Sequence, residues 1–204
     1  MIGSLTHAAV SRRILTSRVV VLAFFLAVLL TESARKDSLL AATLFLLGTI
    51  LVGAAIAGRL WCSVYISGYK SAELITTGPY SICRNPLYFF SFLGFLGVGL
   101  ATETLTLALV LGCAFLIGYR AVIDREEREL SFLFGAKYQA YCASTPRFFP
   151  ALSKFEEPVT HVVNPALFRR TMGDVVWFVW LIGIIEFVEA LHTHGVIRPL
   201  LQLP

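Results

Sequence analysis

Long apolar runs dominate this chain and restrict what it can fold into. A helix needs about 20 mostly apolar residues to cross a bilayer. Five runs reach that length or can be extended to it, at Val19–Thr31, Leu39–Gly58, Leu87–Ala101, Leu105–Tyr119 and Val175–Leu191. Only 15% of the residues are charged, against about 25% in a typical soluble domain. We therefore expect an all-α fold, a polytopic transmembrane bundle of about five spans with interfacial helices.

The basic residues predict how such a bundle is oriented. Of the 17 Lys and Arg residues, all but Arg35, Lys36 and Arg198 fall on one side of the five expected spans. The positive-inside rule then predicts a multi-pass membrane protein whose N-terminus and polar motifs face the cytoplasm. The net charge of +4 suits a surface that lies against anionic lipid headgroups and requires no nucleic-acid partner. We expect the first apolar run to be retained rather than cleaved as a signal peptide.

A rigid polar stretch, TTGPYSICRNPLYFF, separates the second and third apolar runs. Gly78 and Pro79 predict a turn. Pro86 suits the first turn of a helix, which puts Asn85 at the N-cap position. A helix N-terminus together with Arg84 can hold a carboxylate or a phosphate. The same residues are equally typical of a capped interfacial helix, so the pattern leaves both interpretations open.

A second polar stretch, IDREEREL, follows the fourth apolar run and predicts that its helix continues beyond the bilayer until Gly135. Glu126 and Glu127 are about 100° apart on a helix, so they cannot share one face. One of them pointing into the bundle would indicate function, because an intramembrane carboxylate is costly. The alternative is a solvated run of charges.

Several cofactor-binding and metal-binding motifs are absent from the sequence, which limits the kinds of site that it can form. The sequence contains no dinucleotide-binding or phosphate-binding glycine motif, so any cofactor must bind within the helical bundle. Its four cysteines show no CxxC spacing and its four histidines are scattered. We therefore expect no metal site, no metal partner and no disulfide. Gly94, Gly97 and Gly99 permit either close helix packing or close backbone approach to a ligand.

The two polar stretches together resemble the superfamily of integral-membrane methyltransferases that includes isoprenylcysteine carboxyl methyltransferases and phospholipid methyltransferases. The resemblance covers about Ala72 to Pro150. The matching pieces, in chain order, are Gly78-Pro79-Tyr80, Arg84-Asn85-Pro86-Leu87-Tyr88, Glu126-Glu127 with Leu130, Phe134-Gly135 with Tyr138, and Tyr141.

The resemblance implies S-adenosylmethionine as the methyl donor. The residues expected to bind it are Ala72, Glu73, Leu74, Ile75, Tyr80, Arg84, Asn85, Pro86, Leu87, Tyr88 and Glu127, of which Arg84 is added from its bidentate chemistry. Asn85 stands where the family usually has histidine, so proton transfer at that position is excluded. Ile123 stands where carboxyl methyltransferases have a substrate-binding arginine, and Arg125 and Arg120 are the nearest substitutes. We assign Glu126 as the candidate proton acceptor and Arg125 as a candidate catalytic residue.

We expect three parts: N-terminal transmembrane helices at residues 1–71, a methyltransferase core at 72–150, and an interfacial linker with a last span at 151–204. The predicted function is methyl transfer from S-adenosylmethionine to a lipid amine, isoprenoid acid or thiol. The alternatives are an NADPH-dependent membrane reductase of the sterol-reductase type and a non-catalytic accessory protein. Glu186 and Glu189 in the last run remain without a role.

Overall fold

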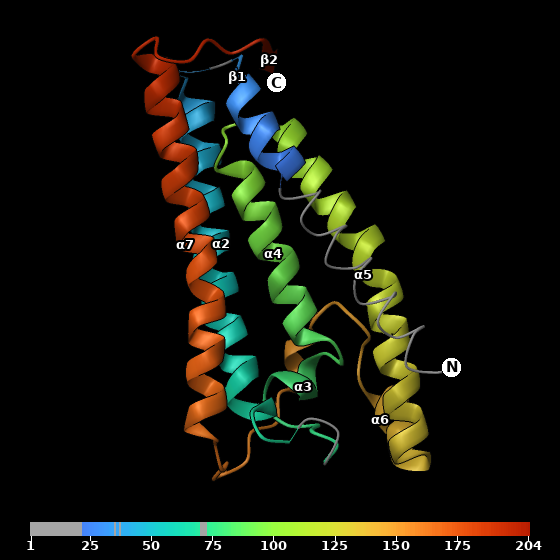
Figure 1. Ribbon diagram of the computed structural model, residues 1–204. Helices are drawn as coiled ribbons and strands as arrows, with labels where there is room; N and C mark the ends of the chain where they lie inside the picture. Colours follow the sequence, from blue (N-terminus) through green and yellow to red (C-terminus); the bar gives the residue numbers. More distant parts are fainter. Residues whose placement is uncertain (1–21, 35, 37, 70–72) are drawn as a thin grey trace, which may run out of the picture.

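Four long helices run side by side and form the body of the molecule (Figure 1). The computed structural model describes residues 22–34, 36, 38–69 and 73–204. The long helices are α2 (Leu39–Ile66), α4 (Pro86–Leu100), α5 (Leu105–Phe134) and α7 (Pro165–Thr193). Residues 22–30 are also helical. The predicted all-α membrane bundle is confirmed.

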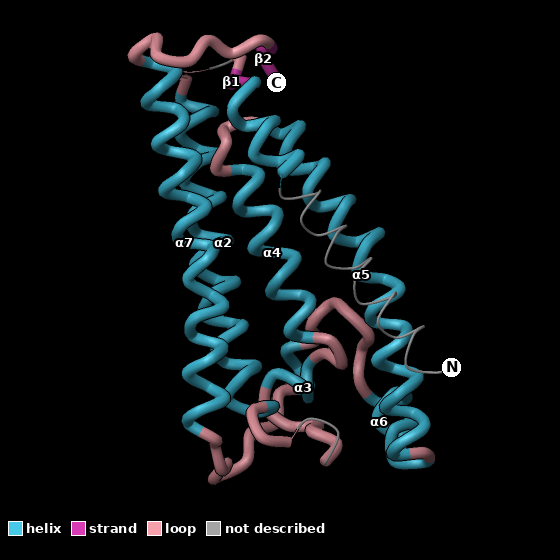
Figure 2. Tube along the Cα trace, in the orientation of Figure 1, coloured by secondary structure: helices cyan, strands magenta, loops and turns pink. Residues whose placement is uncertain are grey.

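Short elements gather at one end of this bundle, which we call the motif end because it holds both polar stretches (Figures 1 and 2). They are α3 (Pro79–Ile82), α6 (Ala136–Ser144) and the 3₁₀ helix η1 (Leu152–Lys154). The opposite end carries two three-residue strands, β1 (Thr31–Ser33) and β2 (Leu201–Leu203). They pair in parallel with Thr31 opposite Leu201, a pairing that the hydrophobic pattern did not predict.

Three of the described helices, α2, α5 and α7, are long and apolar enough to cross a membrane. Helix α4 is apolar but has 15 residues. Part of the first expected run lies outside the described residues, and its described part is the helix at 22–30. The described residues therefore contain three full-length candidate spans where the sequence led us to expect about five.

Helices α2 and α4 touch through their backbones. A Cβ atom added at Gly97 would lie 2.7 Å from the carbonyl oxygen of Gly48, and one added at Gly48 would lie 2.6 Å from the backbone nitrogen of Ala101. Both distances are too short for a side chain, so small residues are required at this crossing. Close helix packing, one of the two interpretations of the glycine-rich segment, is what Gly97 provides.

Helix boundaries at the motif end follow the expected signals with one difference. Helix α4 begins at Pro86, and α5 continues as one helix to Phe134 before Gly135, whose φ is 51°. Asn85 lies at the N-cap position of α4, but its side chain forms no capping hydrogen bond. That side chain instead donates hydrogen bonds to Glu127 and to the carbonyl of Arg147.

Candidate functional site

The turn at Gly78 positions α3 and the start of α4. Gly78 has a φ of 61°, and an added Cβ would lie 2.3 Å from the ring of Tyr65. Its N–H donates a hydrogen bond of 2.7 Å to the carbonyl of Glu156. A residue with a side chain would be strained by its dihedral angle and would also collide with the ring, so glycine is required here.

A segment from residue 145 to residue 161, which we call the strap, holds this region from outside. The backbone N–H of Arg84 donates to the carbonyl of Pro146 at 2.8 Å, and the N–H of Ala151 donates to the carbonyl of Ile82 at 2.9 Å. The N–H of Glu156 donates to the hydroxyl of Ser81 at 3.0 Å. The strap therefore fixes α3 by backbone hydrogen bonds to α3 and to the residues that follow it.

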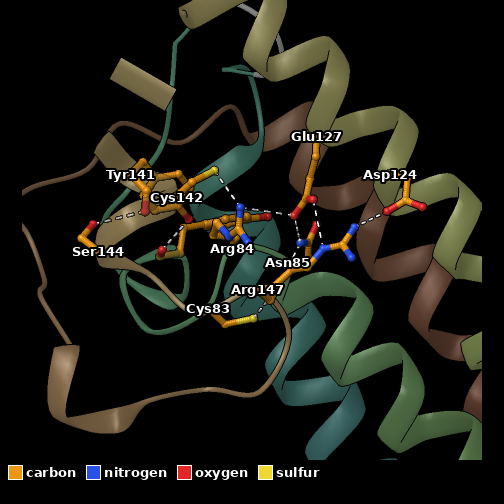
Figure 3. A network of polar contacts seen from close by, with 10 residues as sticks. Cys83, Arg84, Asn85, Asp124, Glu127, Tyr141, Cys142, Ser144 and Arg147 are labelled. Atoms are coloured by element: carbon orange, nitrogen blue, oxygen red, sulfur yellow. Dashed lines mark hydrogen bonds and ion pairs between the residues drawn. The ribbon is translucent and has the colours of Figure 1, made fainter. Parts of the chain in front are cut away.

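Asn85 and Glu127 join the two polar stretches (Figure 3). Asn85 is buried, with 8% of its surface exposed. Its Nδ2 donates to Glu127 Oε1 at 2.9 Å and to the carbonyl oxygen of Arg147 at 3.0 Å. Asn85 thus links the start of α4 to α5 and to the strap at once.

Two arginines complete the surroundings of Glu127 (Figure 3). Arg147 Nε donates to Glu127 Oε2 at 3.0 Å, and the same guanidinium contacts Asp124. The hydrogen bond to Asp124 is the largest cause that raises the pKa of Arg147, and the interactions with Glu127 raise it further. Arg84 Nη1 lies 3.7 Å from Glu127 Oε1 and donates to the sulfur of Cys142 at 2.7 Å. Glu127 is therefore the central anion of a network that orients Arg84.

A cavity of about 130 Å³, which we call the Tyr80 cavity, lies beside this network. Its lining residues come from the end of α2, the loop after it, α3, α5 and α6. They are Ile66, Tyr69, Glu73, Leu74, Ile75, Tyr80, Arg84, Glu126, Glu129, Leu130 and Tyr141.

Two residues that line this cavity each carry a buried polar atom with no partner among the described residues. The hydroxyl of Tyr80 and the Nε of Arg84 are buried without a hydrogen bond to any described residue. Burial raises the pKa of Tyr80 well above its ordinary value, so its hydroxyl stays a neutral donor. Buried polar groups are almost always satisfied, and two exceptions lining one cavity indicate a ligand site.

The charges of the lining favour a cationic ligand. Glu73, Glu126 and Glu129 contribute three carboxylates, and Arg84 contributes one positive charge. A partly closed site with this excess of negative charge attracts cations, while Arg84 can hold an anionic group of the same molecule.

The structure brings together six of the residues assigned to the site from the sequence. Glu73, Leu74, Ile75, Tyr80, Arg84 and Glu126 line the Tyr80 cavity. Ala72 lies outside the described residues.

The other assigned residues do not line this cavity. Asn85 and Glu127 hold Arg84 and the strap, as described above. Pro86 is fully buried, and Leu87 packs against the cluster of Cys62, Tyr65 and Tyr80. Tyr88 lies against α5, with its ring centroid 5.5 Å from that of Tyr119, and Arg125 is exposed on α5.

Sequence reasoning missed several residues that the site uses. Tyr141 was matched to the family pattern but given no role, and its hydroxyl donates to the carbonyl of Tyr80 at 2.6 Å, while burial raises its pKa. Arg147 had been counted only as a basic residue. Tyr69 and Glu129 line the cavity without having been assigned. Their signal was weak, because tyrosine and glutamate are common near any membrane surface.

A family of known proteins matches the part of the chain that holds both polar stretches. The family model described as "Phospholipid methyltransferase" matches residues 37–137, which include both motifs. A nickel-cobalt-cadmium resistance protein of Alcaligenes xylosoxydans xylosoxydans is 44% identical over 172 residues, 84% of this chain and 80% of the relative. This chain belongs to the phospholipid methyltransferase family.

A second relative of this chain is a cobalt-zinc-cadmium resistance protein of Cupriavidus metallidurans. It is 43% identical over 185 residues, 90% of this chain and 85% of the relative. No solved structure matches the chain.

The names of these relatives correct one prediction. We expected no metal partner, and that expectation is wrong, because both relatives are named for resistance to metals. The described residues contain no group of three or more metal-ligating side chains. Scattered cysteines and histidines argue against a clustered metal site, but they do not bear on other ways in which a membrane protein is involved with metals.

Proposed function

We propose that this protein transfers a methyl group from S-adenosylmethionine to a lipophilic acceptor, and that the Tyr80 cavity is the donor site. The observation that carries the proposal is the pair of buried, unpartnered polar groups, Tyr80 Oη and Arg84 Nε, on residues that line a cavity rich in carboxylates. The positive-inside pattern supports a cytoplasmic location for this end of the bundle, where the donor is available.

The donor fits the lining by its charges. It carries a cationic sulfur, an ammonium and a carboxylate. Arg84 suits the carboxylate as a charged donor, and Glu73, Glu126 and Glu129 suit the positive groups. The ring of Tyr69 or Tyr80 offers an aromatic face for the sulfonium or the adenine.

When bound, S-adenosylmethionine supplies a methyl group on a positively charged sulfur, which keeps the bonding electron pair as a neutral thioether. The protein positions the reactants and keeps water away. A thiolate or carboxylate acceptor needs no proton acceptor. A neutral amine or hydroxyl acceptor loses its proton to Glu126, the lining carboxylate assigned to that role.

Tyr80→Phe and Tyr141→Phe test the donor site as a matched pair. The hydroxyl of Tyr80 has no partner among the described residues, so its removal leaves the unliganded protein as stable as the wild type or more stable. Its loss weakens donor binding by about 2- to 10-fold, the range of one hydrogen bond. Tyr141→Phe breaks the hydrogen bond to Tyr80 O and lowers stability by about 1–2 kcal/mol.

Calorimetric titration with S-adenosylmethionine and thermal unfolding in detergent measure the two effects. The proposal is refuted if Tyr80→Phe binds the donor like the wild type and instead loses stability. NADPH serves as a parallel ligand, because tight NADPH binding without donor binding would favour a membrane reductase. Absence of binding by both ligands would favour a non-catalytic accessory protein.

The acceptor reaches the donor through a second cavity of about 330 Å³, the Tyr119 cavity. Its lining is largely apolar, from Phe115, Leu116, Ile117, Ile123 and Phe148, with Tyr119, Arg120 and Arg147. Arg147 contacts Glu127, and Glu127 pairs with Arg84 of the Tyr80 cavity. The Glu127 network therefore lies between the two cavities, as a lipophilic acceptor meeting a polar donor requires.

In cells, this methylation serves resistance to divalent metals, the role for which the two relatives are named. Growth of a deletion strain in nickel, cobalt, cadmium or zinc tests this role. Wild-type protein restores growth, and Glu127→Gln, expressed at equal level, does not. Full rescue by that variant would separate resistance from methyl transfer and direct attention to metal binding by the protein itself.

A further inference from the structure

Arg59 lies in an unusual place for a charged residue. It is on α2, one of the three candidate spans, seven residues before the helix ends at Ile66. Seven residues are two helical turns, about 10 Å along the axis. Arg59 directly follows the apolar run Leu39–Gly58, and an arginine at this level is costly when it is buried in the bundle without a paired carboxylate.

The contacts of Arg59 leave its charge without a counter-ion. Its Nη1 donates to the hydroxyl of Ser91 on α4, and that hydroxyl donates to the carbonyl of Leu87 at 2.7 Å. Its Nε is buried without a hydrogen-bond partner among the described residues. No ion pair joins Arg59 to any carboxylate in the described part of the chain.

A cavity of about 240 Å³ opens at this guanidinium, and we call it the Arg59 cavity. Ser91, Tyr119 and Asp174 are its other polar lining residues. The remaining lining residues are apolar: Phe24, Phe95, Val98, Leu111, Trp177, Phe178 and Leu181. Val98, Leu111 and Phe178 belong to the main hydrophobic core between the helices. The cavity therefore has one cationic group and apolar walls that continue into the core.

We propose that the Arg59 cavity binds an acidic amphiphile, a hydrocarbon chain that bears a carboxylate or a phosphate. The anionic group accepts hydrogen bonds from Arg59, including its unpartnered Nε, and the chain lies along the apolar wall. The ligand thus provides a counter-ion for Arg59 in a cavity whose walls are mostly apolar. This site stands on the surroundings of Arg59 and is independent of the donor site.

Asp174 provides a test of the proposal, because its negative charge disfavours an anion in this cavity. Asp174 lines the same cavity from α7 and repels an anion bound there. Its replacement by asparagine should therefore strengthen binding of an acidic amphiphile, while removal of Arg59 should weaken it.

Trp177 lines this cavity but is 68% exposed, so occupancy is read as the part of its fluorescence quenching that Arg59→Gln removes. The assay uses the full chain with Trp61→Phe and Trp180→Phe, so that Trp177 remains as the single tryptophan. The protein is held in nanodiscs of zwitterionic lipid at pH 8. The three probes share one dibrominated chain and carry a carboxylate, a phosphate monoester or a neutral alcohol.

We expect both acidic probes to bind at least tenfold more tightly than the alcohol, the range of a charge-assisted hydrogen bond. Arg59→Gln should abolish this preference while still binding the alcohol, which shows that the cavity has formed. Asp174→Asn should increase the preference. Arg169→Gln, which removes one exposed positive charge from α7, should leave it unchanged.

Equal binding of acid and alcohol by the unsubstituted protein would overturn the proposal, and so would a preference that survives Arg59→Gln. A preference for the phosphate alone or for the carboxylate alone would support the site and identify which acidic group it binds. Donor binding measured in the same preparations separates failure of this site from failure of the methyltransferase assignment.

Discussion

Replacing Glu127 with glutamine tests whether its carboxylate organises the site. The carboxylate accepts hydrogen bonds from Asn85 at 2.9 Å and Arg147 at 3.0 Å, and it lies 3.7 Å from Arg84. Glutamine keeps the shape but removes the negative charge between two arginines. Its amide nitrogen also turns one acceptor into a donor that faces another donor.

The magnitude follows from how deeply each contact is buried. The hydrogen bond from buried Asn85 to a charged acceptor contributes about 1.5 kcal/mol. The pair with Arg147 contributes less than about 1 kcal/mol, because the side chain of Arg147 is 41% exposed. The contact with Arg84, whose side chain is 16% exposed, contributes an amount similar to that of the pair with Arg147. We expect Glu127→Gln to lose about 2–3 kcal/mol, which lowers Tm by about 4–12 °C for a chain of this size.

Donor binding should fall by tenfold or more in the same variant, because Arg84 loses its anchor beside the Tyr80 cavity. Asp124→Asn is the matched control. It makes the same chemical change one turn earlier on α5 and also contacts Arg147, but unlike Glu127 it has no hydrogen bond or ion pair with Arg84 or Asn85 among the described residues. Thermal unfolding and calorimetric titration should show little change for this control. A Tm and an affinity for Glu127→Gln within error of the wild type would refute the reasoning, and an equal loss in Asp124→Asn would assign the effect to Arg147.

Three further predictions concern the same end of the bundle. Gly78→Ala should lower Tm by several degrees in thermal unfolding, because a Cβ there meets the ring of Tyr65 at 2.3 Å; an unchanged Tm would contradict this packing. Cys83 should resist alkylation at pH 8, since burial raises its pKa to about 11 and lowers its thiolate fraction about 100-fold. Its labelling rate should rise as pH approaches 11, and rapid labelling at pH 8 in the folded protein would be inconsistent with burial. Asn85→Asp should weaken donor binding in calorimetry, because it places a second carboxylate against Glu127; wild-type affinity would argue against the network.

Much of the fold was predictable because its signals are local. Apolar run lengths indicated the membrane helices, Pro86 marked the start of α4, and Gly135 marked the end of α5. The 100° separation of Glu126 and Glu127 correctly implied different surroundings. Glu126 lines the cavity, and Glu127 turns to the arginine network.

The contacts that complete the site were not predictable, because they join residues far apart in the chain. Gly78 bonds to Glu156 and Arg84 bonds to Pro146 through backbone groups, which leave no trace in residue type. Residues 151–161 of the strap fell within the expected interfacial linker, and residues 145–150 fell at the end of the expected methyltransferase core. The pairing of β1 with β2 was missed for a related reason, since three-residue strands are too short to show a periodic pattern.

The hydrogen bonds of Asn85 explain in physical terms why asparagine stands where the family usually has histidine. Its Nδ2 donates two hydrogen bonds from one atom, to Glu127 Oε1 and to the carbonyl of Arg147. A neutral imidazole carries one N–H in total, and a protonated one carries its two N–H groups on different sides of the ring. Histidine therefore cannot reproduce both bonds from a single point, whereas asparagine ties α5 and the strap together without titrating near neutral pH. Since Asn85 holds no transferable proton, a neutral acceptor must lose its proton to another group, and we propose Glu126, which lines the Tyr80 cavity, as the carboxylate that receives it.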